Sequence, residues 1–178
     1  MYIVRLAVTL LIITGLMAAI LAGVNSICAP KIAEITAQKT TQAIAAVLPD
    51  AETAAEVAYT DPNGVVTCVY ESDSGYAITV APVGFDGEIE MMVGVSKDGF
   101  TVTGISIINQ TETAGLGAIC AASNSKGVAF RDQFVGMSGT LAVNKDGGEV
   151  EAITSATITS RAVVSGVNAA LACAAELG

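Results

Sequence analysis

Five hydroxyl side chains lie within seven residues near the carboxyl end of this chain. They belong to Thr154, Ser155, Thr157, Thr159 and Ser160, and apolar residues at helical spacing follow directly. Serine or threonine oxygens at a helix start accept hydrogen bonds from the free N–H groups of the first turn, which makes a helix cap one interpretation. The same N–H groups and the positive end of the helix dipole also attract a phosphate group. Residue types alone leave both interpretations open.

Histidine is absent from the 178 residues, so the chain lacks the commonest general base and the commonest metal ligand. The cysteines are widely spaced and include no Cys-x-x-Cys pair of the kind that indicates a zinc or iron–sulfur site. They are Cys28, Cys68, Cys120 and Cys173. We therefore expect neither metal ligands nor catalytic side chains, and a redox function would depend on a bound cofactor.

An uncharged segment from Leu6 to Pro30 lies near the amino terminus. Its apolar part, residues 6–24, matches the roughly 20 residues that cross the hydrocarbon core of a bilayer. A cleaved signal peptide is the alternative interpretation, but the apolar region of a signal peptide is typically about 7–15 residues long. We therefore expect a retained transmembrane helix that embeds residues 6–24 in a membrane.

The part of the chain after Pro30 carries all 17 acidic side chains and seven of the eight basic ones, which gives it a net charge of −10. Such a charge disfavours nucleic acid and anionic lipid surfaces as partners. The basic residues nearest the apolar segment are Arg5 before it and Lys31 and Lys39 after it. Because the positive-inside rule needs an asymmetry in these residues, charge counting does not decide the orientation.

The chain is predicted to contain one anchor and one domain. Residues 1–29 form the transmembrane anchor, residues 30–49 a helical stalk with a solvated polar middle, and residues 50–178 the domain. Strands are predicted at residues 65–70, 76–83, 88–95 and 100–108. The last two form a hairpin with a bulge at Gly104, and a final helix at residues 158–177 packs on the sheet.

The run Thr154-Ser155-Ala156-Thr157 resembles the flavinylation motif of the FMN-binding domain family, written as Asp, two variable residues, Ser or Thr, Gly, Ala and Thr. In that family a flavin transferase joins FMN to the last threonine through a phosphoester bond, and the matching residue here is Thr157. Two positions depart from the motif, because Glu151 stands in place of Asp and Ser155 in place of Gly. Serine restricts the backbone if a glycine-only conformation is required there.

Three further segments resemble the same family and occur in its order. Residues 87–99 resemble its central hairpin, residues 112–117 its Glu-Thr-Pro-Gly-Leu-Gly signature with Ala114 in place of Pro, and residues 130–134 its Phe-x-x-Gln-Phe segment. With one amino-terminal span, the chain resembles the G subunits of Rnf complexes, which are ion-translocating ferredoxin:NAD oxidoreductases. It is also similar to the related C subunits of sodium-translocating NADH:quinone reductases.

The resemblance implies an α+β domain in which helices pack on a twisted, mostly antiparallel sheet, on the periplasmic or extracellular side of the cell membrane. It implies covalent FMN on Thr157, attached by a flavin transferase. The chain would then be an electron-transfer subunit that works with other membrane subunits of an oxidoreductase and translocase.

The resemblance also implies a set of cofactor-binding residues around Thr157. Thr159 and Ser160 are candidates for the phosphate shell, and residues 112–117 would approach the isoalloxazine ring. Arg161 is either a counter-charge for the phosphate or a solvated surface arginine. The implied cofactor-binding residues are Thr157, Thr154, Ser155, Ala156, Thr159, Ser160, Glu112, Thr113, Gly115, Leu116 and Gly117.

Two other interpretations remain open. The chain is alternatively a membrane-tethered binding or assembly domain without flavin, in which the hydroxyl cluster only caps a helix. A third interpretation keeps the flavin but assigns the chain to another respiratory or extracellular electron-transfer system. The mass of the native chain separates the flavin-free interpretation from the other two, and co-purifying membrane subunits separate those two from each other.

Overall fold

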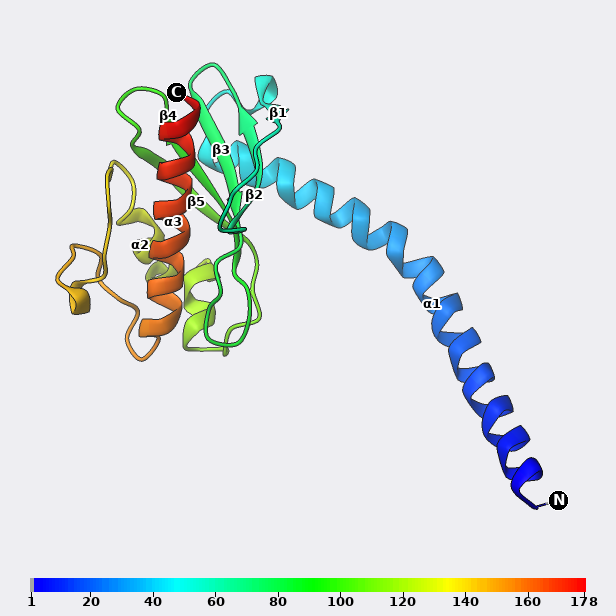
Figure 1. Cartoon of the computed structure of the whole chain (residues 1–178). Coiled ribbons are helices and arrows are strands. Elements are labelled where there is room, and N and C mark those ends of the chain that lie inside the picture. Colours follow the sequence, from blue (N-terminus) through cyan, green and yellow to red (C-terminus); the bar gives the residue numbers. More distant parts are fainter. Residues whose placement is uncertain (1) are drawn as a thin grey trace. The chain divides into compact units, whose positions relative to one another are not determined.

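A computed structural model describes residues 2–178, which form an α+β fold built on one antiparallel sheet (Figure 1). The helices are α1 (Tyr2–Val47), α2 (Ser125–Asp132) and α3 (Thr157–Leu177), with 3-10 turns η1 (Ala51–Thr53), η2 (Gly117–Ala121) and η3 (Asn144–Asp146). The strands, in both chain order and sheet order, are β1 (Ala55–Val57), β2 (Val66–Glu71), β3 (Gly75–Val80), β4 (Glu90–Ser96) and β5 (Val102–Asn109). This confirms the fold class that the resemblance implied.

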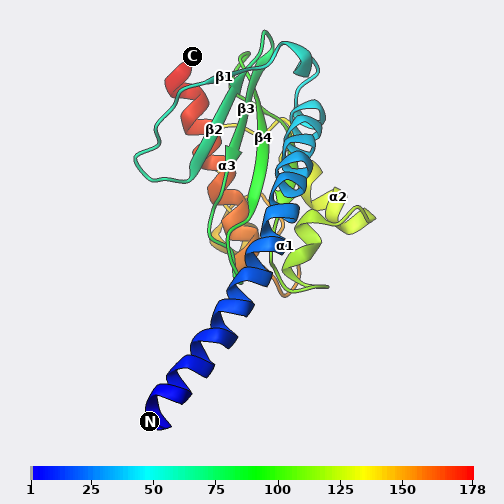
Figure 2. The same ribbon diagram turned by 90° about the vertical axis from the view of Figure 1, so that its right-hand side faces the viewer.

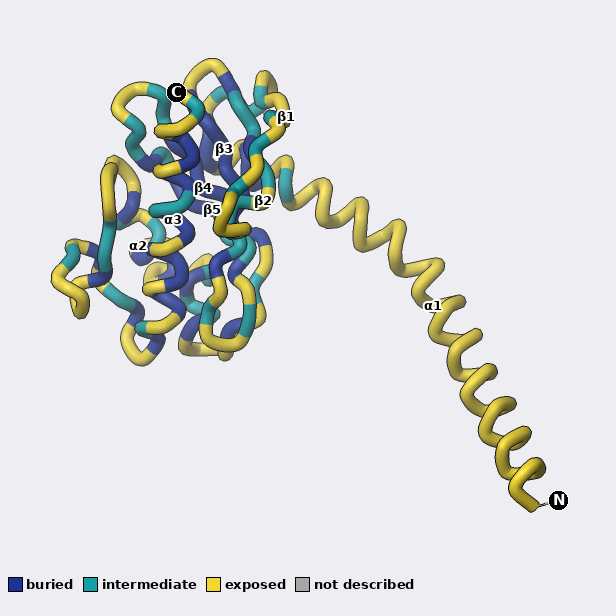
Figure 3. Tube along the Cα trace, in the orientation of Figure 1, coloured by how far each residue is buried: buried dark blue, intermediate teal, exposed yellow. Residues whose placement is uncertain are grey.

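The chain divides into two compact units, one up to Lys39 and one from Thr40 onwards. In the first unit the large apolar side chains between Leu6 and Val24 are all exposed (Figure 3). Within residues 2–178, α1 and α3 are long and apolar enough to cross a membrane, but most of α3 is buried in its own domain. Helix α1 is therefore the candidate membrane span, as expected for residues 6–24. The predicted boundaries between anchor, stalk and domain, after residues 29 and 49, stay predictions. Helix α1 continues through Pro30 without a break.

The predicted hairpin is confirmed as strands β4 and β5. Its turn is closed by a hydrogen bond from the Ser96 N–H to the Thr101 carbonyl. The register shifts next to Gly104, which confirms the predicted bulge. Met91 and Met92 are adjacent in β4 and are both fully buried, but they belong to separate apolar clusters on opposite faces of the sheet.

Helix α3 covers one face of this sheet (Figure 1). Its predicted apolar stripe is buried throughout, and comprises Val163, Val164, Val167, Ala170, Leu171 and Ala174. Gly166 permits close contact with the sheet, because a Cβ atom there would overlap Met91 and lie 2.9 Å from Pro82 Cγ. This tight packing fixes the position of the first turn of α3, where Thr157 lies.

The last two turns of α1, which belong to the second unit, pack on the opposite face of the sheet (Figure 2). The residues of this smaller cluster are Ala43, Ile44, Val47, Leu48, Ala77, Met92 and Ile108. Gly94 leaves room for the helix end, since a Cβ there would lie 2.6 Å from the Val47 carbonyl oxygen, and Thr103 donates a hydrogen bond to that oxygen at 2.6 Å. The carboxyl-terminal end of the predicted stalk is therefore part of the hydrophobic core. A sheet with two apolar faces must bury both of them, and here the end of α1 packs on the second face.

Candidate functional site

Thr157 is the first residue of α3, and the structure places it at an uncapped helix start. The N-cap position is Ala156, which has no side-chain oxygen, and no side-chain cap is formed. The Ser160 N–H makes the first hydrogen bond of the helix, to the Ala156 carbonyl, so the preceding N–H groups have no partner within the helix. The interpretation of the hydroxyl cluster as a helix cap is therefore wrong.

Two of the five hydroxyls, those of Thr159 and Ser160, are buried and make hydrogen bonds within the domain. The Ser160 hydroxyl accepts from the Ile153 N–H at 2.9 Å and donates to the Ala156 carbonyl at 3.0 Å. Thr159 donates from Oγ1 to Oε2 of Glu112 at 2.5 Å. Both hydroxyls are thus already hydrogen-bonded within the domain, and their direct contact with a phosphate stays a prediction.

Glu112 is a buried carboxylate that joins three separate segments of the chain. Besides Thr159 in α3, it accepts from the N–H groups of Phe85 and Asp86, at 2.7 and 3.1 Å, through Oε1. Glycine on both sides leaves space for it, because a Cβ at Gly84 or Gly117 would overlap one of the two carboxylate oxygens and displace it from its hydrogen bonds. The loop at residues 84–87, the segment at 112–117 and the start of α3 are therefore fixed to one another.

The hydrogen bonds at Glu112 also set its ionisation. Burial raises its pKa, but the hydrogen bond from Thr159 and the two backbone donors outweigh this effect, so its pKa lies below its ordinary value of 4.5. Glu112 is therefore an ionised carboxylate at neutral pH. A buried anion with matched donors keeps its neighbours in one geometry, because breaking any of these bonds leaves charge unsatisfied.

Ser155 adopts a left-handed backbone conformation with φ of 65°. This is the position at which the family motif has glycine, and a glycine there has no Cβ to clash with the carbonyl oxygen. The serine retains the left-handed turn at an energetic cost. The other departure from the motif, Glu151, is exposed, and its backbone is held by Gln133.

The two segments singled out in the sequence meet around one small pocket of about 160 Å³. Its lining comprises Phe85, Glu112, Thr113, Leu116, Gly117, Ser155, Ala156, Ile158 and Thr159. All of these except Phe85 and Ile158 were candidates from the sequence. Phe85, Leu116 and Ile158 are large apolar side chains that stay exposed, at 67%, 42% and 51% of their surface. They give this pocket, called here the apolar pocket, an uncovered apolar rim.

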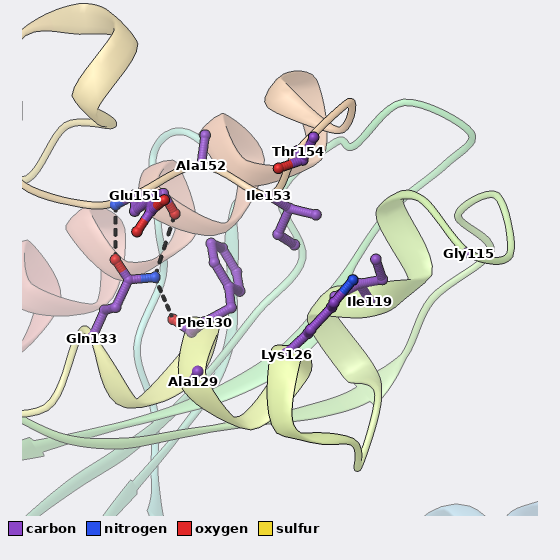
Figure 4. A pocket seen from close by; sticks show the side chains of 10 residues that line it. All are labelled: Gly115, Ile119, Lys126, Ala129, Phe130, Gln133, Glu151, Ala152, Ile153 and Thr154. Atoms are coloured by element: carbon purple, nitrogen blue, oxygen red, sulfur yellow. Dashed lines mark hydrogen bonds between the residues drawn. The ribbon is translucent and has the colours of Figure 1, made fainter.

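A larger pocket of about 640 Å³ lies beside residues 151–154 (Figure 4). Of the candidates from the sequence it contains Gly115 and Thr154, and its other lining residues are Ile119, Lys126, Ala129, Phe130, Gln133, Glu151, Ala152 and Ile153. In Figure 4 the Gln133 amide bonds the backbone of Glu151, accepting from its N–H at 2.8 Å and donating to its carbonyl at 3.3 Å. Gln133 thereby makes with the Glu151 backbone the two hydrogen bonds that a residue of a neighbouring strand would make, which fixes the start of the motif.

One contact of Thr157 was missed by sequence reasoning. Lys145 in η3 donates from Nζ to Oγ1 of Thr157 at 2.9 Å. Arg161, a candidate counter-charge, is instead paired with Asp146. Lys145 and Thr157 lie on two different elements, η3 and α3, so no periodicity within one helix or strand signals the contact.

Known proteins resemble this chain along most of its length. Residues 84–172 match the FMN-binding domain family. The G subunit of the Na(+)-translocating ferredoxin:NAD(+) oxidoreductase complex of Acetobacterium woodii is 35% identical, over 92% of this chain and 87% of that protein. The G subunit of the ion-translocating oxidoreductase complex of Methanosarcina acetivorans is 32% identical, over 95% of this chain and 93% of that protein. That of Pseudoalteromonas atlantica is 45% identical over 49% of this chain and 41% of that protein.

The backbone at Ser155 predicts opposite effects for two substitutions. Ser155→Gly should keep or raise the free energy of unfolding, by up to about 1 kcal/mol, because it removes the Cβ from a left-handed residue. Ser155→Val should lower the free energy of unfolding by about 1–3 kcal/mol. Denaturant titration of the full chain in detergent measures both.

Ser165→Val, on the exposed side of α3, is the control and should lower the free energy of unfolding by less than about 1 kcal/mol. Equal losses for the two valine variants would contradict strain at Ser155.

The lowered pKa of Glu112 predicts a pH-dependent contribution to stability. At pH 7, Glu112→Gln should lower the free energy of unfolding by about 1–3 kcal/mol, because an amide donor replaces a carboxylate oxygen that faces N–H or O–H donors. Because the folded-state pKa lies below 4.5, this contribution is present above that pH and is lost as the pH falls below it.

Thermal unfolding between pH 7 and pH 3 should therefore show the wild type and Glu112→Gln converging at low pH. Glu88→Gln is the matched control, since Glu88 is exposed, and it should follow the wild type throughout. A constant difference between Glu112→Gln and the wild type over the whole pH range would contradict the assignment of a hydrogen-bonded carboxylate.

Proposed function

Because this chain belongs to the FMN-binding domain family, in the group formed by the G subunits of ion-translocating oxidoreductase complexes, we propose that it is a flavin-carrying electron-transfer subunit of such a complex. Its FMN is joined to Thr157 through a phosphoester bond. The observation that carries this proposal is the hydroxyl of Thr157 on an uncapped helix start, held within the matching family motif. Bound FMN would supply the electron transfer itself, so the chain has only to hold and orient it.

The surroundings of Thr157 fit a phosphate-linked group. Thr157 is half-buried, and the free N–H groups of the first turn of α3 suit an anion at this position. The neighbouring hydroxyls of Thr159 and Ser160 are used inside the domain, which leaves Thr157 as the accessible acceptor at the helix start. The tight packing of α3 on the sheet keeps this acceptor in a fixed place.

The isoalloxazine ring is proposed to rest on the rim of the apolar pocket. Phe85, Leu116 and Ile158 expose apolar surface around that pocket, and a flat aromatic ring would cover part of it. The segment 112–117 supplies Leu116 and is held in place by Glu112. Thr113, Gly115 and Gly117 would then shape the backbone around the ring rather than contact it through side chains.

The partners of the chain are proposed to be other membrane subunits of an Rnf-type complex, with a flavin transferase required for maturation. The exposed apolar part of α1 supports an association with a membrane. The domain is placed on the extracellular or periplasmic side, as in the family it resembles. Covalent attachment on that side would prevent loss of the cofactor to a large volume.

Expression with and without a flavin transferase tests the attachment to Thr157. The loaded chain should gain the mass of one FMN less one water, and should give a flavin-fluorescent band on a denaturing gel. Thr157→Ala should abolish both signals, because the acceptor oxygen is gone, whereas Thr157→Ser should retain them. Protease added to the outer side of the membrane should remove the fluorescent band, since the domain is proposed to lie there.

Thr140→Ala is the matched control for Thr157→Ala, because Thr140 is an exposed threonine outside the motif. It should load like the wild type. A fluorescent band that persists in Thr157→Ala would refute the attachment site. An unmodified wild-type chain from cells that contain the transferase would favour the membrane-tethered domain without flavin.

The ring position is tested by the absorption spectrum of the loaded chain. Leu116→Ala should shift the visible flavin bands toward those of free FMN in water, because the ring loses apolar cover. Val135→Ala is the control, since Val135 is similarly exposed at 52% but does not line the apolar pocket. Identical spectra for Leu116→Ala and the wild type would place the ring elsewhere, and the larger pocket would then be the next candidate.

A further inference from the structure

The Thr157 hydroxyl already has a cation beside it. Lys145 lies 2.9 Å away, measured from its Nζ to Oγ1 of Thr157. An ammonium group only donates hydrogen bonds, so the threonine oxygen is the acceptor and its own proton is directed elsewhere. A phosphate placed on this oxygen would bring its charged oxygens within reach of the same ammonium group, and such charge-assisted hydrogen bonds are the strong ones.

Lys145 has no carboxylate partner within residues 2–178. The neighbouring carboxylate, Asp146, forms a bidentate ion pair with Arg161, and both N–O distances are 2.7 Å. This pair offsets the charge of Arg161, and the described residues show no ion pair between Asp146 and Lys145. In a chain with a net charge of −9, Lys145 is therefore a cation available to an anionic group at Thr157.

The backbone that carries Lys145 is held in place by several contacts. Val143 and Val150 are both fully buried and form an isolated parallel bridge. The Asn144 N–H donates to the Val150 carbonyl at 2.7 Å, and the ion pair of Asp146 and Arg161 ties the same turn to α3. The base of the Lys145 side chain is thus fixed relative to Thr157, although its ammonium group is exposed.

We propose that Lys145 is a cofactor-binding residue that pairs with the phosphodiester joining the flavin to Thr157. This inference rests on the proposed function. The phosphodiester carries one negative charge, and Lys145 would bind it from one side while the free N–H groups of the first turn of α3 bind it from the other. The same charge favours loading, because a negative phosphate group must approach Thr157. In this step the Thr157 oxygen bonds to the FMN phosphorus of a flavin dinucleotide donor, the phosphoanhydride bond of the donor breaks, its nucleoside monophosphate leaves and the hydroxyl proton passes to solvent.

The test incubates four full-length proteins in detergent with a flavin transferase and its flavin donor. The loading rate of each protein is measured from its intact mass over time. Lys145→Ala should load at least about tenfold more slowly than the wild type, since a charge-assisted contact is lost. Lys145→Arg should load within about threefold of the wild type, because arginine also binds phosphate. Lys31→Ala is the matched control, because it removes the same charge at an exposed lysine that lines neither pocket, and it should load like the wild type.

A second readout does not depend on the rate of the transferase. Loading should raise the thermal unfolding temperature of the wild type and of Lys145→Arg more than that of Lys145→Ala, since only the cation pairs with the added phosphate. The unloaded forms of all four proteins should unfold at the same temperature, because the Lys145 contact with Thr157 is exposed.

The outcomes separate this inference from the proposed function. Loading that depends on Thr157 but proceeds in Lys145→Ala at the wild-type rate, with the same rise in unfolding temperature, would overturn the role of Lys145 alone. A slow Lys145→Ala that is not rescued by Lys145→Arg would also overturn it, because charge would then not be the cause. A wild type that does not load at all would overturn the proposed function and this inference with it.

Discussion

The buried carboxylate of Glu112 is the interaction on which the site depends. A charged carboxylate that is removed from water is tolerated only when hydrogen-bond donors surround it. Here the donors come from the loop at 84–87 and from Thr159 in α3. Three stretches that are distant in sequence must therefore converge before Glu112 is satisfied. The glycines at 84 and 117 leave space for this network, since a Cβ at either position would overlap a carboxylate oxygen.

The packing of α3 converts this local network into a fixed position for Thr157. The apolar stripe of α3 is buried against β3 and β4, so the start of the helix cannot shift without opening the core. The loop before α3 is held by the Ser160 hydroxyl on one side and by the Gln133 amide on the other. The strained backbone of Ser155 is tolerated because these contacts determine the course of the chain.

The five hydroxyls of the motif region divide into different roles once the chain is folded. Thr159 and Ser160 are internal hydrogen-bonding groups, whereas Thr157 presents its oxygen to a cation at the protein surface. Thr154 and Ser155 are exposed and line the two pockets.

Much of the fold follows from the sequence by itself, because strand alternation, helical periodicity and turn residues are local properties. The hairpin of β4 and β5, the bulge at Gly104 and the buried stripe of α3 were predicted in this way. The membership of the FMN-binding domain family was predicted instead from the resemblance of its motifs. The partners of each polar group were decided only by the tertiary structure. Thr159 donates a hydrogen bond to Glu112, and Arg161 forms an ion pair with Asp146. Lys145 donates a hydrogen bond to Thr157. The end of α1 is buried against the sheet. These contacts join residues far apart in sequence, so they depend on the packing of the whole domain and no local pattern encodes them.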